Sequence, residues 1–135
     1  MVREFMMKLD ELQPSQLFIS SAKLARVMSD SNTVTPDSLA PIPIKRLAGK
    51  VICTDGHTRA LAALLNGLAE VRVCWDEDEL DWEAYKTCLQ WCEEEGIHTI
   101  ADLKNRIVSP TEYERLWLGR CGEMQQQLAV RRRHR

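Results

Sequence analysis

Five consecutive residues, Asp55-Gly56-His57-Thr58-Arg59, place a carboxylate, an imidazole, a hydroxyl and a guanidinium directly after a short apolar run. The apolar run predicts a strand, Asp-Gly predicts a tight turn, and the residues that follow predict the start of a helix. The first turn of a helix has unpaired backbone N–H groups and the positive end of the helix dipole. Gly56 permits close approach of a ligand to the backbone, and Arg59 adds a forked cation. The sequence therefore predicts an anion site, most simply a phosphate site, at this turn.

Each polar side chain of the turn also has a structural interpretation. Asp55 could cap the helix by accepting from the amides of His57 or Thr58, or it could hold Mg²⁺ through water. His57 could donate to a phosphate oxygen or be a solvated residue at the helix start. Arg59 is the strongest candidate ligand, because its planar fork matches a phosphate.

The elements around the turn are predicted from periodicity. A helix is expected over 57–66, with Leu61, Leu64 and Leu65 on one face and Gly67 just past its end. Residues 41–47 and 50–53 are expected to form a hairpin with Gly49 in its turn, and 71–75 alternates as a half-buried strand does. Upstream, residues 5–9 also alternate, and Ser20 is expected to cap a helix that carries Leu24, Val27 and Met28.

This order of elements resembles the ParB/sulfiredoxin superfamily over residues 3–75. The similarity is carried by the 55–59 turn, with support from Pro41-Ile42-Pro43-Ile44 and Leu12-Gln13-Pro14. It implies an α+β fold with a small mixed sheet and helices, followed here by a helical C-terminal region. It also implies that the Gly-x-x-Arg turn and the helix start hold a nucleotide, ATP, ADP or CTP, with Mg²⁺ as a companion ion. Members include CTP-dependent DNA-partition clamps, ATP-dependent sulfiredoxins and ADP-dependent free-serine kinases.

Two of these activities are not expected from the residues present. Sulfiredoxins have a reactive cysteine where this chain has His57, and the nearest thiol, Cys53, lies on the preceding strand. Partition clamps have Gly-Glu-Arg-Arg at the turn and a second polar motif in a following helix. Residues 103–110 are faintly similar to that motif but lie far downstream.

The turn is most similar to that of the free-serine kinases, Asp-Gly-His-His-Arg. Those enzymes have a carboxylate base just after a proline in the first strand-to-helix connection. Here Pro14 is followed by Ser15-Gln16-Leu17, which cannot supply that base, and Asp10 and Glu11 are the substitutes considered. We therefore expect a protein that binds a nucleotide or another phosphate ligand at this turn, with a small-molecule kinase as the enzymatic form of this expectation, and assign no catalytic residue. The alternative is a non-catalytic ParB-like interaction or regulatory module associated with DNA-related functions.

The second half of the chain is predicted to be helical. One helix begins at Asp81 and ends at Gly96, and a second begins at Thr99, with Leu103 and Ile107 on its inner face. A third begins at the capping box 109–112, with a proline at its first position. Its apolar stripe includes Tyr113, Leu116, Trp117, Arg120, Cys121, Met124 and Leu128, while Gly122 weakens it and Gln125–Gln127 and the terminal arginines are expected to fray.

The cysteines are interpreted as packing residues. Cys88 and Cys92 lie four residues apart on one apolar stripe, and with His98 and Cys121 they could be drawn as a metal site. Structural zinc sites usually have tighter paired spacing, so we expect buried thiols and no metal. The aromatic set of Trp82, Trp91, Tyr113 and Trp117 is likewise expected to be core or interface.

Composition bounds the rest. The chain has 135 residues and a formal net charge of −2, a length that suits one domain. We expect a core over 1–78 that binds a nucleotide or another phosphate-bearing small molecule. A helical region over 79–130 and a basic tail over 131–135 are expected to follow it. We expect a cytoplasmic protein that does not contact membrane. The sequence has no apolar run long enough to span a bilayer, its five cysteines are odd in number and widely spaced, and its first five residues contain no long apolar region. Specific nucleic-acid binding is not expected from so short a tail. The oligomeric state is left open, a homodimer being the assembly considered.

Overall fold

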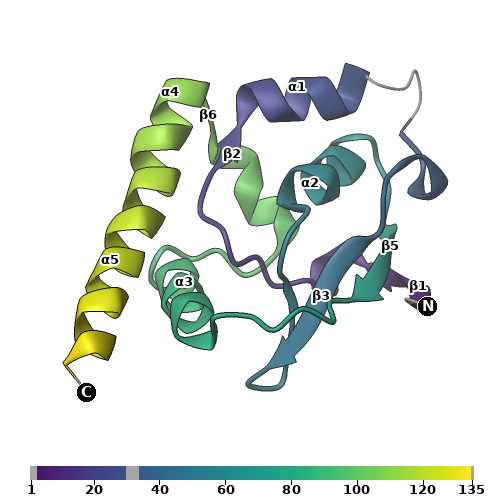
Figure 1. The fold of residues 1–135 in the computed structure, drawn as a ribbon. Helices are drawn as coiled ribbons and strands as arrows, with labels where there is room; N and C mark the ends of the chain where they lie inside the picture. The colour runs from purple at the N-terminus through teal and green to yellow at the C-terminus, as the bar shows by residue number, and fades with distance from the viewer. Residues whose placement is uncertain (1–2, 30–33, 135) are drawn as a thin grey trace.

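A four-stranded mixed sheet forms the centre of the computed structural model, which describes residues 3–29 and 34–134. The strand order is β1 (Glu4–Lys8), β5 (Glu70–Trp75), β3 (Ile42–Leu47) and β4 (Lys50–Cys53). β5 runs antiparallel to β1 and parallel to β3, and β3 runs antiparallel to β4. In Figure 1 the sheet lies at the right of the view, with the α-helices to its left and above it. The predicted α+β class with a small mixed sheet is confirmed.

Strand register explains which side chains face the core. Phe5 lies opposite Val73, and Ile42 lies beside Val73 on the other neighbouring strand. Ile44 lies opposite Cys53 in the hairpin. Because side chains alternate along a strand, these residues share one face of the sheet, and all but the half-buried Phe5 are completely buried.

The β3–β4 hairpin and the helix that follows match their predictions. The hairpin turn is Ala48-Gly49, and both residues have positive φ, as a two-residue turn between right-twisted strands requires. α2 (His57–Leu65) ends at Asn66, before Gly67 at φ 82°. Leu61 is fully buried, but Leu65 is 42 % exposed, so the predicted face of three leucines is wrong at its last member.

Small side chains take the place of that third leucine. Ala60, Ala62 and Ala63 are completely buried, which lets α2 approach its neighbours closely. One neighbour is α1 (Ser21–Ser29), which packs against α2 (Figure 1). Ser20 caps α1 as predicted, because its hydroxyl accepts from the Lys23 amide. Of its predicted face, Leu24 is buried and Val27 half-buried, while Met28 is 37 % exposed.

The C-terminal half contains the predicted helices with two differences. Asp81 caps α3 (Trp82–Glu94), and the next segment is a 3-10 helix, η3 (Ile100–Asn105). Ile107 does not continue that helix: it lies in β6 (Ile107–Val108), which pairs in parallel with β2 (Ile19–Ser20). The last helix runs through α4 (Pro110–Tyr113), a π-helical turn η4 (Glu114–Leu118) and α5 (Gly119–Arg133).

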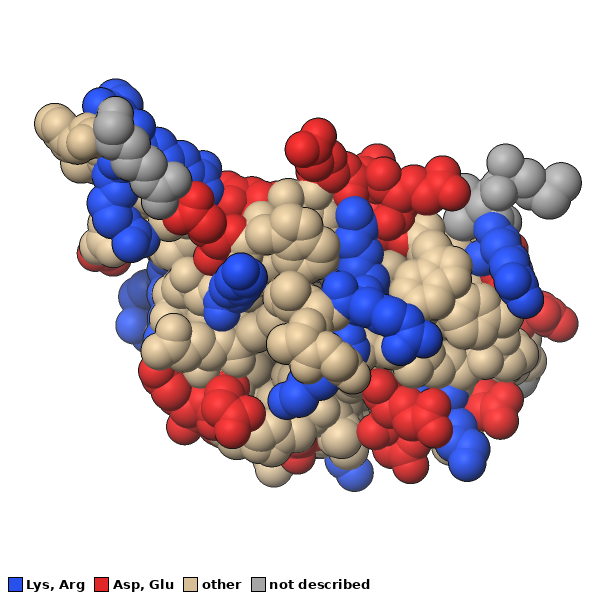
Figure 2. Space-filling model, turned by 90° about the horizontal axis from the view of Figure 1, so that it is seen from below, with Lys and Arg blue, Asp and Glu red and all other residues tan. Residues whose placement is uncertain are grey.

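The end of α5 is helical where fraying was predicted. The helix continues through Arg133. Arg132 forms an ion pair with Asp81 at 2.7 Å and a longer one with Glu83 at 3.5 Å, which tie this end to the start of α3. Other basic side chains of this end project from the body at the left of Figure 2. The ion pairs explain the difference, because a helix end with a tertiary partner is held more firmly than its polar sequence indicates.

One apolar cluster joins both halves of the chain. Ile100 and Leu103 of η3 are fully buried in the same cluster as Leu61 of α2. Trp91 of α3 and Trp117 of η4 meet edge to face, with ring centroids 6.1 Å apart. Two further short 3-10 turns, η1 (Leu9–Glu11) and η2 (Pro36–Ser38), connect strands and helices. Within the described ranges, no helix has the length and apolar character needed to cross a membrane.

Candidate functional site

The first turn of α2 presents unpaired backbone amides. Gly56 precedes the helix in a left-handed conformation, φ 77°, and has no side chain with which to cap it. The first helical hydrogen bond is donated by Ala60 to the Gly56 carbonyl. The amides of His57, Thr58 and Arg59 have no acceptor among the described residues. These amides and the helix dipole make an electropositive point at the end of the turn.

Asp55 does not cap the helix in the predicted manner. Its Oδ1 accepts from the amide of Gly56 at 2.8 Å, rather than from His57 or Thr58. Its side chain is exposed beside the helix start. The capping interpretation is therefore wrong in its partners, and the carboxylate stabilises the turn one residue earlier.

A cavity of about 280 Å³ lies against this turn. We call it the anion cavity; it is lined by all five residues of the 55–59 turn and by Gln16, Lys23, Arg26, Val27 and Tyr113. Three of the lining side chains are cations, and Asp55 is the one carboxylate among the described residues that line it. Sequence reasoning missed Lys23 and Arg26, whose spacing of three residues on α1 puts both on one helical face. What it could not show was that this face is turned toward the start of α2.

Arg59 folds back over its own turn. Its Nη2 donates to the carbonyl of Pro41 at 3.1 Å, while its Nε is buried and has no hydrogen-bond partner within residues 3–29 and 34–134. A Cβ at Gly56 would lie only 2.7 Å from the Arg59 Nη2. Glycine at this position therefore serves two purposes, the left-handed backbone and the space for the guanidinium.

His57 is buried, and this overturns the interpretation of a solvated helix start. It is 4 % exposed, and its Nε2 accepts from the backbone amide of Ser15 at 2.9 Å. Burial lowers the pKa of His57 to about 4, so the imidazole is neutral at pH 7. Because Nε2 is the acceptor, the ring proton is on Nδ1.

The segment around Pro14 positions Ser15 against His57. The backbone of Gln13 pairs with β4: its N–H donates to the Val51 carbonyl, and its carbonyl accepts from the Cys53 N–H. The hydroxyl of Ser15 donates to the Cys53 carbonyl at 2.7 Å and lies 3.5 Å from the His57 Nε2. Ser15 is thus buried, and both its backbone N–H and its hydroxyl donate hydrogen bonds.

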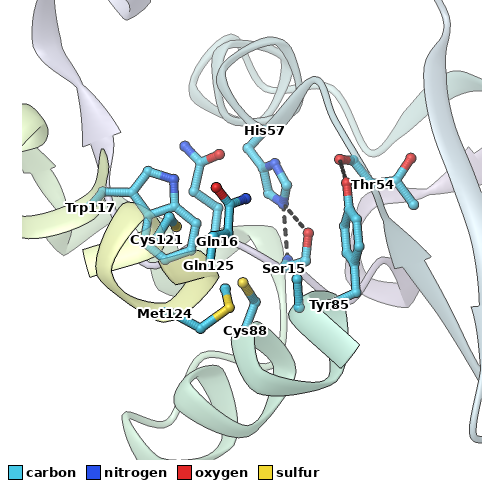
Figure 3. Close-up of a pocket in the computed structure, with 11 residues that line it drawn as sticks. Ser15, Gln16, Thr54, His57, Tyr85, Cys88, Trp117, Cys121, Met124 and Gln125 are labelled. Atoms are coloured by element: carbon cyan, nitrogen blue, oxygen red, sulfur yellow. Dashed lines mark hydrogen bonds between the residues drawn. The ribbon is translucent and has the colours of Figure 1, made fainter. Parts of the chain in front are cut away.

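A second cavity, of about 220 Å³, shares two wall residues, Gln16 and His57, with the anion cavity. Figure 3 shows its lining, which comes from the Ser15–Gln16 segment, the start of α2, α3 and the last helix. Gln16 donates to the Tyr113 hydroxyl at 3.1 Å, which places this amide between the cavities. The remaining lining residues are Ser15, Thr54, Ala84, Tyr85, Cys88, Trp117, Cys121, Met124 and Gln125.

The carboxylates considered as substitute bases lie elsewhere. Neither Asp10 nor Glu11 lines the anion cavity, and Glu11 borders a separate hollow beside β1. Both belong to η1. The lining of the anion cavity therefore gives no support to either residue as a base at this site.

The four residues drawn as a metal set do not converge. His98 is exposed and pairs with Glu93 at 3.5 Å. Cys92 is buried in the core, and its thiol contacts the carbonyl of Gln16. Cys88 is buried as predicted and lies at the second cavity with Cys121. Among the described residues, no group of three or more His, Cys, Asp or Glu is placed to hold a metal ion.

Comparison with known proteins gives a fold and no family. No protein-family model matches the sequence, and no curated protein matches it. The structure is similar to the crystal structure of protein Atu1540 from Agrobacterium tumefaciens, with a TM-score of 0.53 and 13 % sequence identity. The match covers 76 % of this chain and 62 % of that one, so this chain spans less than two thirds of that protein. At this identity the likeness concerns the fold alone.

Proposed function

We propose that this protein binds a phosphate-bearing small molecule, a nucleotide by preference, in the anion cavity. The observation that carries the proposal is that Lys23, Arg26 and Arg59 line the same cavity as the unpaired amides at the start of α2. Cations and helix-start amides both favour a bound anion, and together they do so more strongly than either does alone.

In this proposal different lining residues contact different phosphate groups of the ligand. The amides of 57–59 donate to one phosphate group, and Arg59 contributes a guanidinium whose Nε has no hydrogen-bond partner in the part of the chain that the structure describes. Lys23 and Arg26 approach from α1 and balance the charge of a second phosphate. In this proposal Asp55 holds Mg²⁺ through water. The similarity of the 55–59 turn to the ParB/sulfiredoxin superfamily supports a nucleotide over a simple inorganic anion.

Binding is better supported than phosphotransfer. Asp55 is the one carboxylate among the described lining residues, and it already accepts from the Gly56 amide. General-base assistance contributes roughly 10²–10⁴ in rate. We therefore expect only a trace of O-phosphoserine when the protein is incubated with ADP or ATP, Mg²⁺ and free serine. Rapid formation would instead assign the role of base to Asp55, and Asp55→Asn would then abolish it.

A thermal-shift panel tests the proposal without a choice of second substrate. The panel contains ATP, ADP, CTP, pyrophosphate and sulfate, each with and without Mg²⁺. A ligand that binds the folded protein raises its melting temperature in a concentration-dependent way, and ligand at 100 times its Kd adds about 2.7 kcal/mol of stability. We expect a rise with at least one nucleotide, a smaller one with sulfate and a reduced one in Arg26→Ala.

The matched control is Arg46→Ala. Arg46 is an exposed arginine on β3 that stacks on Trp75 and does not line the anion cavity. Its loss should leave the nucleotide response unchanged. Absence of any shift at millimolar nucleotide, or an equal loss of response in both variants, would refute binding at this cavity.

A further inference from the structure

Two cysteines meet at the second cavity, and the proposed nucleotide site does not use them. Cys88 belongs to α3 and Cys121 to α5, two helices that pack against each other, and the two thiols lie close enough to affect each other's pKa. Both line the second cavity, with Met124 beside them in the lining (Figure 3). Cys88 is buried, whereas Cys121 is partly exposed. A small reagent therefore reaches Cys121 first.

The two helices are held together around this pair. The indole of Trp91 on α3 meets Trp117 edge to face, and the Arg120 guanidinium lies 4.1 Å from the centre of the Trp91 ring. Arg120 also forms an ion pair with Glu95 at 3.1 Å. These contacts flank Cys121 on its own helix, so the approach of the thiols is a property of the packed helices and not of one mobile side chain.

The environment makes the two thiols chemically unequal. The neighbouring thiol of Cys121 raises the pKa of Cys88 above its ordinary value, as does burial. The neighbouring thiol of Cys88 lowers the pKa of Cys121, and the charge of Arg120 lowers it further. The thiolate is the nucleophile in thiol–disulfide exchange. Cys121 is thus the attacking thiol, and Cys88 is the thiol that keeps its proton until the second step.

We propose that Cys88 and Cys121 form a reversible disulfide by exchange with a low-molecular-weight disulfide. In the first step the Cys121 thiolate attacks one sulfur of the reagent, which breaks the reagent's S–S bond, forms a mixed disulfide and releases one thiolate. In the second step that thiolate takes the proton of Cys88, and the Cys88 sulfur attacks the Cys121 sulfur, which forms the bond between α3 and α5 and releases the second thiolate. The reagent disulfide is reduced to two thiols, and the cysteine pair is oxidised by two electrons.

The other three cysteines lack this arrangement. Cys53 is buried and its thiol donates to the Asp55 carbonyl, while Cys92 is completely buried. Cys74 is partly exposed on β5, but its cross-strand neighbours are Glu4 and Pro43. Cys74 is therefore the matched control: a partly exposed thiol on the same protein whose direct cross-strand neighbours are not cysteines.

The test uses the full chain, purified in the reduced form and treated with oxidised glutathione without denaturant. Remaining thiols are alkylated, and proteolytic peptides are identified by mass spectrometry. We expect one linked peptide pair that contains Cys88 and Cys121, a loss of two of the five thiols and full recovery with dithiothreitol. Cys74→Ser should form the same link.

Two variants separate the steps. Cys121→Ser, at a partly exposed position, should fold and form no link. Cys88→Ser should stop at the mixed disulfide, with glutathione retained on residue 121. The proposal is overturned if the wild-type protein retains glutathione on Cys121 without forming the link, or if Cys74 reacts while Cys121 does not. Stoichiometric metal bound by the pair and blocking oxidation would also overturn it. The outcome is independent of nucleotide binding, because the peptide map and the thiol count report on the cysteines alone.

Discussion

The anion cavity and the second cavity share Gln16 and His57, yet the sequence builds them in different ways. Half of the anion-cavity lining is a run of five residues, whose chemistry follows from the local rules for turns and helix starts. The second cavity is assembled from side chains on four separate segments, shown together in Figure 3. Local backbone chemistry can be recognised in one sequence, whereas convergence of distant side chains needs the fold.

The two cavities also differ in the chemistry that they offer. Cations and unpaired amides dominate the anion cavity, which suits charged ligands. The second cavity has Trp117, Tyr85, Met124 and two thiols, which suit apolar contacts and sulfur chemistry. His57, buried and neutral, stands between them, so it cannot supply positive charge to a phosphate at pH 7.

The largest expected effect tests whether the two cavities belong to one cooperative unit. Leu103 is fully buried in the apolar cluster that joins η3 to α2. Leu103→Ala should lower the free energy of unfolding by about 2–5 kcal/mol, with one transition in both tryptophan fluorescence and circular dichroism. The control Leu118→Ala, at a side chain 51 % exposed, should change it by less than about 0.5 kcal/mol. Two separate transitions in the wild type would show that the cavities lie in independent units.

The next prediction concerns the residue that the cavities share. The pKa of His57 is lowered from 6.5 to about 4 by burial, so between these pH values the unfolded chain binds a proton that the folded chain does not. The contribution of His57 to the free energy of unfolding is therefore fully present above pH 6.5. It is lost as the pH decreases toward 4, which lowers the free energy of unfolding by about 3 kcal/mol. Urea titrations at several pH values should show a shallower fall in His57→Gln than in the wild type. The control is His98→Gln, at an exposed histidine, which should keep the wild-type slope; equal slopes in all three proteins would contradict the buried neutral state.

Much of the fold could be predicted because its signals are local. The hairpin at Gly49, the caps at Ser20, Asp81 and Ser109, and the glycine ends of α2 and α3 were all predicted correctly. The short pairing of β2 with β6 could not be predicted, because two-residue strands have no periodicity. Neither could the burial of His57, whose acceptor role depends on Ser15, which is 42 residues away.

A third prediction tests whether the turn supplies the affinity. If Arg59 makes a charge-assisted contact with phosphate, Arg59→Ala should weaken nucleotide binding by about 1.5–3 kcal/mol, which is roughly 10- to 150-fold in Kd. The fold should remain, because the side chain makes one hydrogen bond, to the Pro41 carbonyl. Calorimetric titration of the wild type, Arg59→Ala and the control Arg46→Ala measures this. Equal affinities in all three would show that Arg59 is a structural residue of the turn.

The smallest expected effect distinguishes the two reasons for glycine at position 56, its left-handed backbone and the space that it leaves for Arg59. Gly49 and Gly56 have almost the same φ, 78° and 77°, but a Cβ at Gly49 meets nothing within 4 Å, whereas one at Gly56 meets Arg59. Alanine at either position should cost about 1–2 kcal/mol of stability for the left-handed backbone. Gly56→Ala should also weaken nucleotide binding, since it displaces the guanidinium, and Gly49→Ala should not. Equal affinities in the two variants would remove the close packing of Arg59 on Gly56 from the explanation.

The central claim, that the start of α2 binds phosphate, is tested most directly by following backbone amide signals in ¹⁵N-labelled protein during titration with ADP and Mg²⁺. Amides that donate to a phosphate shift strongly, and those far from it do not. We predict saturable shifts that are largest at His57, Thr58 and Arg59, smaller ones on α1 at Lys23 and Arg26, and a common Kd. Unchanged amide signals at 57–59, with shifts confined to the arginines at the end of α5 or with none anywhere, would contradict the claim.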